Sequence, residues 1–325
     1  MSAAARVRAA VAGFAAGADG PWCVALSGGA DSLALTAAAA ALRPTVALIV
    51  DHRLQDGSDR VAARAAEQAL GLGCQAAEIL TVTVGATGGP EAAARTARHA
   101  ALQDGRGGRP VLLGHTLDDQ AETVLLGLGR GSGPRSIAGM RTWAPPWGRP
   151  LLGLRRAVTA AACAELGLTP WADPHNTDPR FTRVRLRTEV LPLLEEVLGG
   201  GVAEALARTA AALQEDGDVL DDAAAAALAG LDEPIAAAAL AGLPTAVRRR
   251  VLRGWLLAGG AVRLTDLQLR AVDALVTDWR GQGGVAVGGT GLVDAGGAGP
   301  SARLVARRRR GKVVLENDRA SGAGT

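Results

Sequence analysis

Residues 24–33 read Val24-Ala-Leu-Ser27-Gly-Gly-Ala-Asp31-Ser32-Leu33. An apolar run meets two glycines and then an Ala- and Leu-rich pattern of helical spacing, which predicts a strand, a tight loop and a helix. Consecutive glycines let backbone N–H groups approach an anion, and the N-terminus of the next helix adds the positive end of its dipole. The stretch therefore predicts a phosphate-binding loop, although a plain glycine turn before a helix has a similar pattern.

The polar side chains of this loop suit a nucleotide. Ser27 and Ser32 can donate hydrogen bonds to phosphate, and Asp31 can hold Mg²⁺. The Gly-Lys-Ser/Thr ending of a Walker loop is missing. Residues 27–32 instead resemble the pyrophosphate loop of the N-type ATP pyrophosphatases (the PP-loop superfamily), which adenylate a substrate oxygen and release pyrophosphate. The resemblance implies that ATP is bound by Ser27, Gly28, Gly29, Ala30, Asp31 and Ser32.

Length and composition indicate a cytoplasmic enzyme with two domains. The chain has 325 residues, of which 48% are hydrophobic and 2% aromatic. Each apolar run is interrupted before it reaches the length of a membrane span, and the N-terminus lacks the apolar core of a signal peptide. The cysteines Cys23, Cys74 and Cys163 are odd in number and far apart, which favours small buried side chains over disulfides or a metal site.

The distribution of charge is more informative than the net charge of +3. Lys312 is the only lysine, so the positive charge is carried by arginines. They gather at 183–187, at 248–253 and at 307–310. Arginine forks bind phosphate and stack on bases, which is typical of a nucleic-acid partner, whereas solvated helix faces explain the same clusters equally well.

The pattern after the phosphate loop predicts an open parallel α/β sheet. Strands are expected at 46–50, 78–84 and 111–113, and helices at 58–70, with Ser58 as N-cap, and at 90–103. Ligands of such sheets gather at the carboxyl ends of the strands. We therefore expect the phosphate loop, residues 51–52 and residues 115–122 to converge on one crevice.

The loop after the strand at 111–113 contains a histidine and three carboxylates. His115 follows the strand, and Asp119 and Glu122 are three residues apart at the opening of a helix, which places them on one helical face. Asp118 or Asp119 is also a candidate helix cap, but that role does not explain Glu122. A pair of carboxylates at the crevice suits an ammonium group or the removal of its proton.

Taken together, these motifs resemble the tRNA(Ile)-lysidine synthetases. The resemblance is dense over roughly the first 200 residues and looser beyond them. The matching segments are 27–32, 50–52, 91–99, 115–123, 130–133, 149–152, 173–192, 248–250, 264–265 and 279–283.

The resemblance implies ATP-dependent ligation of L-lysine to C2 of the wobble cytidine of a CAU-anticodon tRNA(Ile), through an adenylated tRNA. Asp31 with Mg²⁺ would stabilise the departing pyrophosphate, and Arg95 or His115 would offset the phosphate charge. Asp119 and Glu122 would hold lysine. The positions expected to contact tRNA are Arg130, Arg187, Arg248, Arg249 and Arg250.

Two positions depart from the family pattern, and the C-terminal part is short. Arg53 stands where glycine is common, and Val184 replaces a frequent asparagine. We expect a catalytic domain at 1–195, a helical linker at 196–230, a small and mostly helical tRNA-binding domain at 231–318 and a disordered tail at 319–325. Within the third of these, helices are expected at 244–257 and 264–277, and short strand-like pieces at 285–287 and 304–306. The oligomeric state stays open, with a homodimer among the options.

Weaker patterns have competing interpretations. Gly127–Gly133 follows a helix, which argues against a dinucleotide fingerprint and favours a loop in which Arg130 touches phosphate. Trp143, Trp147 and Trp171 suit either base stacking or packing, and His99 and His175 are expected to be structural. Two alternative functions remain: a tRNA thiolase, which the cysteine spacing does not support, and an RNA-binding protein without catalysis, against which the intact carboxylates argue.

Overall fold

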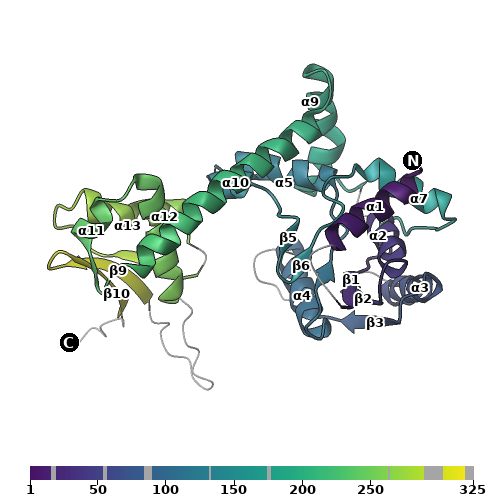
Figure 1. Ribbon diagram of the computed structural model, residues 1–325, viewed down its shortest axis with the longest axis horizontal. Helices are drawn as coiled ribbons and strands as arrows, with labels where there is room; N and C mark the ends of the chain where they lie inside the picture. Colours follow the sequence, from purple (N-terminus) through teal and green to yellow (C-terminus); the bar gives the residue numbers. More distant parts are fainter. Residues whose placement is uncertain are drawn as a thin grey trace. The chain divides into compact units, whose positions relative to one another are not determined.

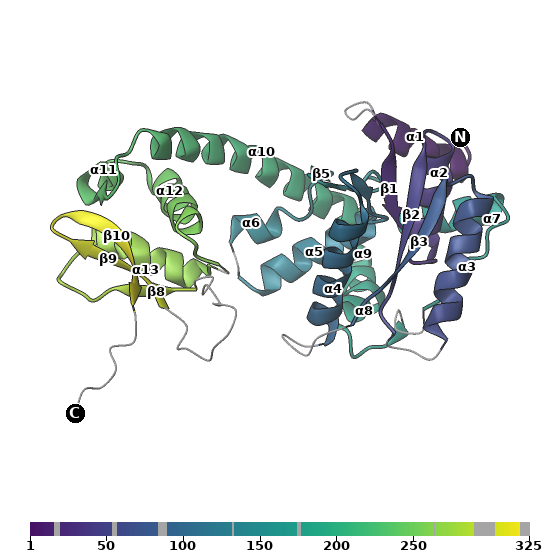
Figure 2. The same ribbon diagram turned by 90° about the horizontal axis from the view of Figure 1, so that it is seen from below.

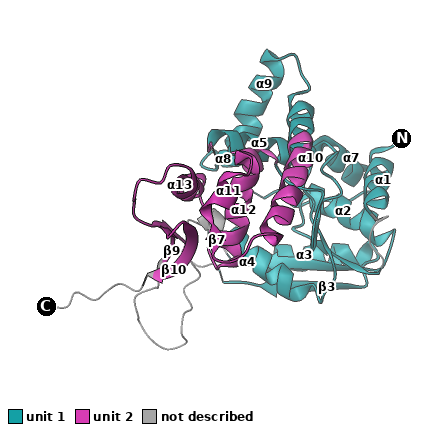
Figure 3. Cartoon of the chain, turned by 60° about the vertical axis from the view of Figure 1, so that its left-hand side comes forward, with its two compact units in different colours: residues 1–129, 139–210 teal, residues 130–138, 211–325 magenta. Residues whose placement is uncertain are grey.

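The computed structural model describes residues 1–15, 20–53, 57–83, 90–131, 133–173, 177–262, 264–288 and 303–318. The chain forms two compact units (Figure 3). Unit 1 comprises residues 1–129 and 139–210, and unit 2 comprises residues 130–138 and 211–325. The division falls inside helix α10 (Val202–Ala229), which occupies most of the stretch predicted to be a helical connection.

Unit 1 is built on a six-stranded sheet with the order β3-β2-β1-β4-β6-β5. The strands are β1 (Trp22–Ala25), β2 (Thr45–Asp51), β3 (Ala76–Thr81), β4 (Val111–Leu112), β5 (Trp143–Ala144) and β6 (Trp147–Gly148). Neighbouring strands run parallel except β5, which pairs antiparallel with β6. The predicted open parallel sheet is therefore confirmed.

Helices cover both faces of this sheet (Figures 1 and 2). One face carries α1 (Ala3–Ala15), α2 (Ala30–Ala40), α3 (Ser58–Gly71) and α7 (Arg156–Glu165), and the other carries α4 (Pro90–Gly105). Side chains alternate along β1 accordingly: Trp22 and Val24 enter the core with α1, α2, α3 and α7, while Cys23 packs with Leu102 of α4. The carboxyl ends of β1, β2 and β4 consequently share one edge of the sheet.

Five further helical segments belong to unit 1, among them α5, which carries the predicted carboxylate pair. They are α5 (Leu117–Gly129), α8 (Thr182–Arg185), a π-helical turn (Leu186–Val190), α9 (Leu191–Val197) and the first part of α10. Leu117 and Ala121 of α5 are buried against Leu191 and Ala203. This small core fixes α5 against the segment that carries Arg183 and Arg187.

Local predictions differ from the structure at two helix or strand ends. Ser58 begins α3 but does not cap it, because the N-cap is Gly57, whose φ of +80° favours glycine. Strand β3 covers 76–81, earlier than the predicted 78–84. Arg53, at a position where related chains favour glycine, has a φ of +50°, so this residue adopts the left-handed conformation that glycine would accept more easily.

Unit 2 combines helices with a four-stranded antiparallel sheet of order β7-β10-β9-β8. Its elements are α6 (Pro134–Ile137), the rest of α10, β7 (Ile235–Ala236), α11 (Ala237–Ala241), α12 (Thr245–Ala258), α13 (Asp266–Thr277), β8 (Val285–Val287), β9 (Arg303–Arg309) and β10 (Lys312–Asp318). The two predicted helices are present as α12 and α13. The prediction of a mostly helical unit is confirmed by the larger share of its described residues in helices, and the unit also contains a hairpin of β9 and β10 around Gly311, where φ is +78°.

The predicted tail at 319–325 and His175 lie outside the described residues. Val184, the other departure from the family pattern, is buried in α8.

Candidate active site

The phosphate loop connects β1 to α2 in unit 1. Gly28 has a φ of +82°, a conformation that favours glycine, and its carbonyl accepts a hydrogen bond from the backbone N–H of Trp171 (2.9 Å). The hydroxyl of Ser32 accepts from the backbone N–H of Ser27 (3.2 Å) and donates to the Gly29 carbonyl (3.0 Å). No side chain caps α2 at Gly29, so its first N–H groups stay available to an anion.

Gly114 brings the loop after β4 into contact with this first turn of α2. A Cβ atom at Gly114 would lie 2.9 Å from the backbone nitrogen of Ser32 and 3.0 Å from the carbonyl carbon of Asp31. Such distances are too short for any side chain, and the obstacle is backbone that cannot swing away. Glycine is therefore required here, and it places the His115 loop directly beside the phosphate loop.

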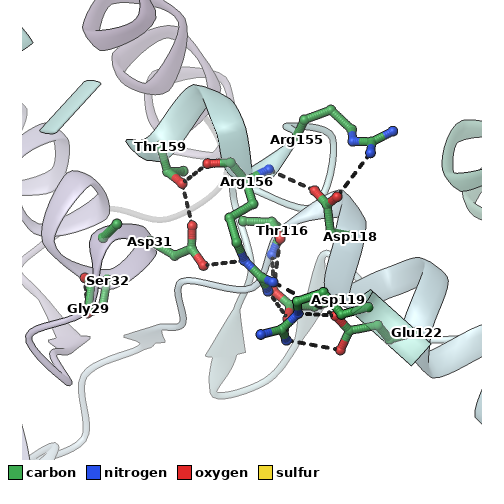
Figure 4. Close-up of polar contacts among 12 residues, drawn as sticks. Gly29, Asp31, Ser32, Thr116, Asp118, Asp119, Glu122, Arg155, Arg156 and Thr159 are labelled. Carbon is green, nitrogen blue, oxygen red and sulfur yellow. Dashed lines mark hydrogen bonds and ion pairs between the residues drawn. The ribbon is translucent and has the colours of Figure 1, made fainter. Parts of the chain in front are cut away.

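Arg156 joins the acidic residues of the two loops (Figure 4). Its Nε lies 3.1 Å from Asp31 Oδ2, its Nη2 lies 2.6 Å from Asp119 Oδ1, and its Nη1 lies 3.8 Å from Glu122 Oε1. Thr159 also donates a hydrogen bond to Asp31. The structure thus brings together the three carboxylates predicted from the sequence, within reach of one guanidinium group.

The two aspartates at the start of α5 have different partners. Asp119 Oδ2 accepts hydrogen bonds from the backbone N–H (2.8 Å) and hydroxyl (2.9 Å) of Thr116, which stabilises the start of α5. Asp118 Oδ2 accepts from the backbone N–H of Arg156 (2.7 Å) at the start of α7, and Asp118 also pairs with Arg155 (3.1 Å). Both aspartates therefore act at helix N-termini, and Asp119 additionally faces the phosphate loop through Arg156.

The pKa values of Asp31 and Asp119 shift in opposite directions. Burial raises the pKa of Asp31, against the opposing effects of Thr159 and Arg156. Burial acts on Asp119 in the same direction, but Arg156 and the hydrogen bonds from Thr116 outweigh it and lower the pKa of Asp119. An additional cation would therefore stabilise the charged form of Asp31 more than that of Asp119.

Glu122 is fully buried and bonded to arginines from the segment that follows α7. Its carboxylate accepts from Arg187 Nε (2.8 Å) and Nη2 (3.2 Å), and Arg183 Nη1 lies 3.5 Å away. Arg187, expected from the sequence to contact tRNA, is thus paired with Glu122 in this structure. A lysine ammonium group reaches Glu122 only if one of these arginines moves aside.

The expected phosphate-facing residues Arg95 and His115 belong to a more basic environment. Burial, together with Arg149, Arg98 and Arg95, lowers the pKa of His115 to about 3, although Asp119 acts in the opposite direction. The imidazole is therefore neutral at physiological pH. His115 can offer a hydrogen bond to a phosphate oxygen but not a positive charge, which leaves Arg95 as the cation of this pair.

The arginines predicted to bind tRNA in unit 2 are largely engaged within the unit. Arg248 is buried, with its Nε 2.6 Å from Asp273 Oδ1, and Arg249 pairs with Asp273 Oδ2 at 2.9 Å. Arg250 Nε lies 2.8 Å from Asp221 Oδ1. Arg130 is exposed. The hypothesis that Arg248 contacts phosphate requires correction, because its guanidinium group is an internal partner of Asp273.

The three cysteines fit packing roles. All three cysteines are buried, as predicted, and burial raises the pKa of Cys74 and Cys163 to about 11.

Among the described residues, no group of three or more His, Cys, Asp or Glu side chains is placed to hold a metal ion. The described residues also contain no helix that is long and apolar enough to cross a membrane.

Sequence reasoning missed Arg156 and Thr159 as members of the site. Their signal was weak: Arg156 and Thr159 lie in the first turn of α7, shortly after a matched family segment, but no motif links Arg156 to Asp31, 125 residues away, or to Asp119, 37 residues away. The link depends on α7 packing beside α2, which only the folded chain shows.

Comparison with known proteins assigns the class first. Residues 5–194 match the PP-loop domain, and residues 235–314 match the TilS substrate binding domain. A solved U34-tRNA thiolase from Methanococcus maripaludis has the same fold, with a TM-score of 0.52, 18% identity, and 66% of this chain and 78% of that chain covered. The chain is thus an ATP-binding protein of the PP-loop class.

The particular family follows from closer relatives. The tRNA(Ile)-lysidine synthase of Rhodococcus erythropolis is 67% identical over 90% of this chain and 88% of its own. That of Mycobacterium bovis is 64% identical over 98% of both chains. This chain belongs to the tRNA(Ile)-lysidine synthase family, and the resemblance drawn from its motifs is confirmed.

Proposed function

We propose that this enzyme ligates L-lysine to C2 of the wobble cytidine of a CAU-anticodon tRNA(Ile). In the first step the cytidine O2 attacks the α-phosphorus of ATP, and the bond to pyrophosphate breaks. In the second step the ε-amine of lysine attacks C2, AMP leaves with the former O2, and the amine loses a proton. The products are lysidine, AMP and pyrophosphate.

The observation that carries this proposal is the junction made by Arg156. A phosphate loop and a carboxylate pair from a different loop lie within the span of one guanidinium group. An adenylating site must hold a nucleotide phosphate and the attacking amine close together, because both react at the same cytidine. Unit 1 supplies both environments at the carboxyl edge of its sheet.

Each side chain has a role in this scheme. The N-terminus of α2 binds phosphate, with the hydroxyl groups of Ser27 and Ser32 beside it, and Arg95 supports the charge that develops on the α-phosphate. Asp119 and Glu122 bind the lysine ammonium group after Arg156 or Arg187 moves away from its carboxylate partner. The carboxylates then orient the amine. Arg130 and the exposed arginines of unit 2 contact tRNA phosphates.

Asp31 fits a magnesium site. Mg²⁺ is usually held by one or two carboxylates together with substrate phosphates, and Asp31 stands at the phosphate loop with a carboxylate whose pKa is raised by burial. When bound there, the ion would neutralise charge on the departing pyrophosphate. Asp31 is the residue that would hold it.

The alternative of a thiolase is not favoured by any observation. The three cysteines are buried, and burial raises the pKa of each thiol, which opposes thiolate chemistry. We further infer a cytoplasmic enzyme, because its substrates ATP, lysine and tRNA meet there. A homodimer remains a prediction that light scattering would test.

Release of pyrophosphate tests the two-step scheme. With ATP and CAU-anticodon tRNA but no lysine, we expect up to one pyrophosphate per tRNA and a labelled AMP–tRNA adduct from α-labelled ATP. Addition of lysine should discharge the adduct. Pyrophosphate release that requires lysine from the start, or that proceeds without tRNA, would contradict an adenylated tRNA intermediate.

A further inference from the structure

The guanidinium group of Arg156 lies between the phosphate loop and the carboxylate pair (Figure 4). Its Nε faces Asp31, while its two terminal nitrogens lie 2.6 Å from Asp119 Oδ1 and 3.8 Å from Glu122 Oε1. An ammonium group held by both carboxylates of the pair would have to lie at the same place. Arg156 in its present position and a lysine ligand therefore exclude each other.

The backbone of Arg156 is fixed, whereas its side chain is open to a ligand. The backbone N–H donates a hydrogen bond to Asp118 Oδ2 (2.7 Å), which ties the start of α7 to the start of α5. The side chain keeps 27% of its surface exposed, whereas that of Glu122 has none. The guanidinium group can thus change partners by rotation about its side-chain bonds, and the helix need not shift.

The charges of the site balance before any ligand binds. Its three carboxylates pair with three guanidinium groups, those of Arg156, Arg183 and Arg187. Burial alone would lower the pKa of Arg156, but the carboxylates outweigh burial and raise it, so they stabilise the charge of this arginine. A lysine ammonium group would add a fourth cation in a partly buried place, which is unfavourable unless one guanidinium group leaves.

A nucleotide at the phosphate loop can draw Arg156 away from the pair. Arg187 pairs with Glu122 at 2.8 Å and with Asp119 at 3.8 Å. Arg156 pairs in addition with Asp31, which stands in the phosphate loop. Arginine binds phosphate with two parallel hydrogen bonds, and a triphosphate carries more negative charge than one carboxylate. The phosphates of ATP would therefore compete with the carboxylate pair for Arg156.

We propose that Arg156 is a substrate-binding residue that makes lysine binding depend on ATP. When ATP is bound, the guanidinium group pairs with its phosphates and leaves the place between Asp119 and Glu122 free for the lysine ammonium group. When ATP is absent, the guanidinium group fills that place. The inference rests on the proposed function, in which the same two carboxylates hold lysine. Because coupling between two ligands is reciprocal, lysine must also strengthen the binding of ATP.

Binding measured without tRNA tests this coupling in the absence of chemistry. Titration calorimetry of the full-length protein gives the lysine dissociation constant with and without α,β-methylene-ATP, at one concentration of Mg²⁺. We expect the analogue to tighten lysine binding to the wild type on the order of tenfold, as is usual for two coupled sites. Lysine should tighten binding of the analogue by the same factor. Equal lysine affinity of the wild type in both states would overturn the proposal.

Arg156→Gln separates this role from that of a structural support. Without the guanidinium group, the carboxylate pair has an excess negative charge. Lysine should therefore bind the nucleotide-free variant about tenfold more tightly than the nucleotide-free wild type, and the analogue should change this affinity less than about twofold. The analogue itself should bind the variant more weakly. Loss of a structural support would weaken lysine binding, and that result in a folded variant would overturn the proposal.

A thermal melt accompanies this variant. If Arg156→Gln does not fold, Arg156→Met takes its place, because methionine keeps the apolar stem of the side chain. The same gain of lysine affinity is expected from it.

Arg155→Gln is the matched control. It removes the same charge one residue earlier, from a guanidinium group that pairs with Asp118 (3.1 Å) and Glu204 (3.1 Å). Its lysine affinity should equal that of the wild type with and without the analogue. If Arg155→Gln loses the coupling as Arg156→Gln does, the effect comes from the overall charge, and the role of Arg156 is refuted.

Two further outcomes distinguish this inference from the proposed function. If coupling in the wild type persists unchanged in Arg156→Gln, the inference is refuted and the proposed function stands. If wild type and variants bind the analogue but none of them binds lysine in either state, the proposed function fails, and the inference fails with it.

Discussion

At the scale of single residues, the site is a balanced set of charges. Three arginines balance the charge of its three carboxylates. Arg156 pairs with Asp31, and Arg187 and Arg183 pair with Glu122, whose side chain has no exposed surface. Ion pairs of this kind preorganise carboxylates, but each must be exchanged when a cationic ligand binds. Substitutions that remove one charge should therefore separate the steps of the reaction.

Asp31→Asn should abolish the first step while preserving the fold. The change removes a charge and the proposed metal ligand but keeps the side-chain shape, and Arg156 keeps its pair with Asp119. We expect pyrophosphate release to fall by about 100-fold or more with little change in melting temperature. Asp118→Asn is the control, because Asp118 binds the start of α7 and Arg155: it should lose stability but retain turnover per folded molecule. Near-normal pyrophosphate release by Asp31→Asn would refute its role at the phosphate.

Glu122→Gln should weaken lysine binding more than adenylation. A charge-assisted hydrogen bond is worth roughly 1.5–3 kcal/mol, so the lysine KM should rise on the order of ten- to a hundredfold, while formation of the adenylated tRNA, which needs no amine, continues. Because Glu122 is buried among arginines, a denaturation curve must show that the variant is folded under assay conditions. If folded Glu122→Gln loses both steps together, Glu122 supports the nucleotide side of the site and does not hold lysine.

His99 and His115 predict a pH dependence of stability. The pKa of His99 is lowered to about 4 and that of His115 to about 3, below the ordinary value of about 6.5. Between these values the unfolded chain binds more protons than the folded chain, so the free energy of unfolding must fall as the pH drops from about 6.5 towards 4. Urea midpoints at pH 7.5 and 5.5 would show it. His99→Gln should reduce the difference, and an identical difference in that variant would contradict the burial of a neutral His99.

At the scale of elements, α12 shows how a cluster of arginines divides between core and surface. Consecutive residues on a helix point about 100° apart, so three successive arginines cannot all face solvent on a helix that packs against a core. The buried face of α12 includes Val251, Leu252 and Trp255. Arg248 lies on the same face and donates a hydrogen bond to Asp273 of α13. Its loss would leave a buried carboxylate with one remaining arginine partner.

Arg248→Ala should therefore destabilise unit 2. Breaking a buried ion pair costs about 3–5 kcal/mol, and here the retained pair with Arg249 places the expected loss at the lower end. The control is Arg270→Ala, which removes a mostly exposed i,i+4 pair with Asp266 and should change stability by no more than about 0.5 kcal/mol. Chemical denaturation measures both variants. Equal stabilities would show that Arg248 is not an internal support and would restore it as a candidate tRNA contact.

Elements with strong periodicity were predictable, and contacts between distant elements were not. The apolar run of β2 and the amphipathic pattern of α13, which Thr265 caps with Gln268, follow from local sequence. The phosphate loop and the carboxylate pair likewise have local motifs. Arg156 has none, because its partners Asp31 and Asp119 are 125 and 37 residues away in the chain and meet it only through packing. Strand β10 was missed because its apolar run, Val313 to Leu315, is only three residues long and is flanked by charged and polar residues.

At the scale of the whole molecule, the chain combines a catalytic unit with a second unit that matches a substrate-binding domain. The described contacts of the catalytic site, from the phosphate loop to Arg187, lie within unit 1. We therefore propose that unit 1 carries the chemistry on ATP and lysine, and we expect unit 2 to contribute contacts to the RNA.

The most direct measurement is the nucleoside composition of the product. The protein is incubated with ATP, isotope-labelled lysine and a CAU-anticodon tRNA(Ile) transcript, and the digested RNA is analysed by liquid chromatography and mass spectrometry. We predict one labelled lysidine per modified tRNA, located at the wobble position, and none when that cytidine is replaced by uridine. Unmodified cytidine at this position in the presence of folded protein and all substrates would contradict the assignment, as would lysine attached at any other site.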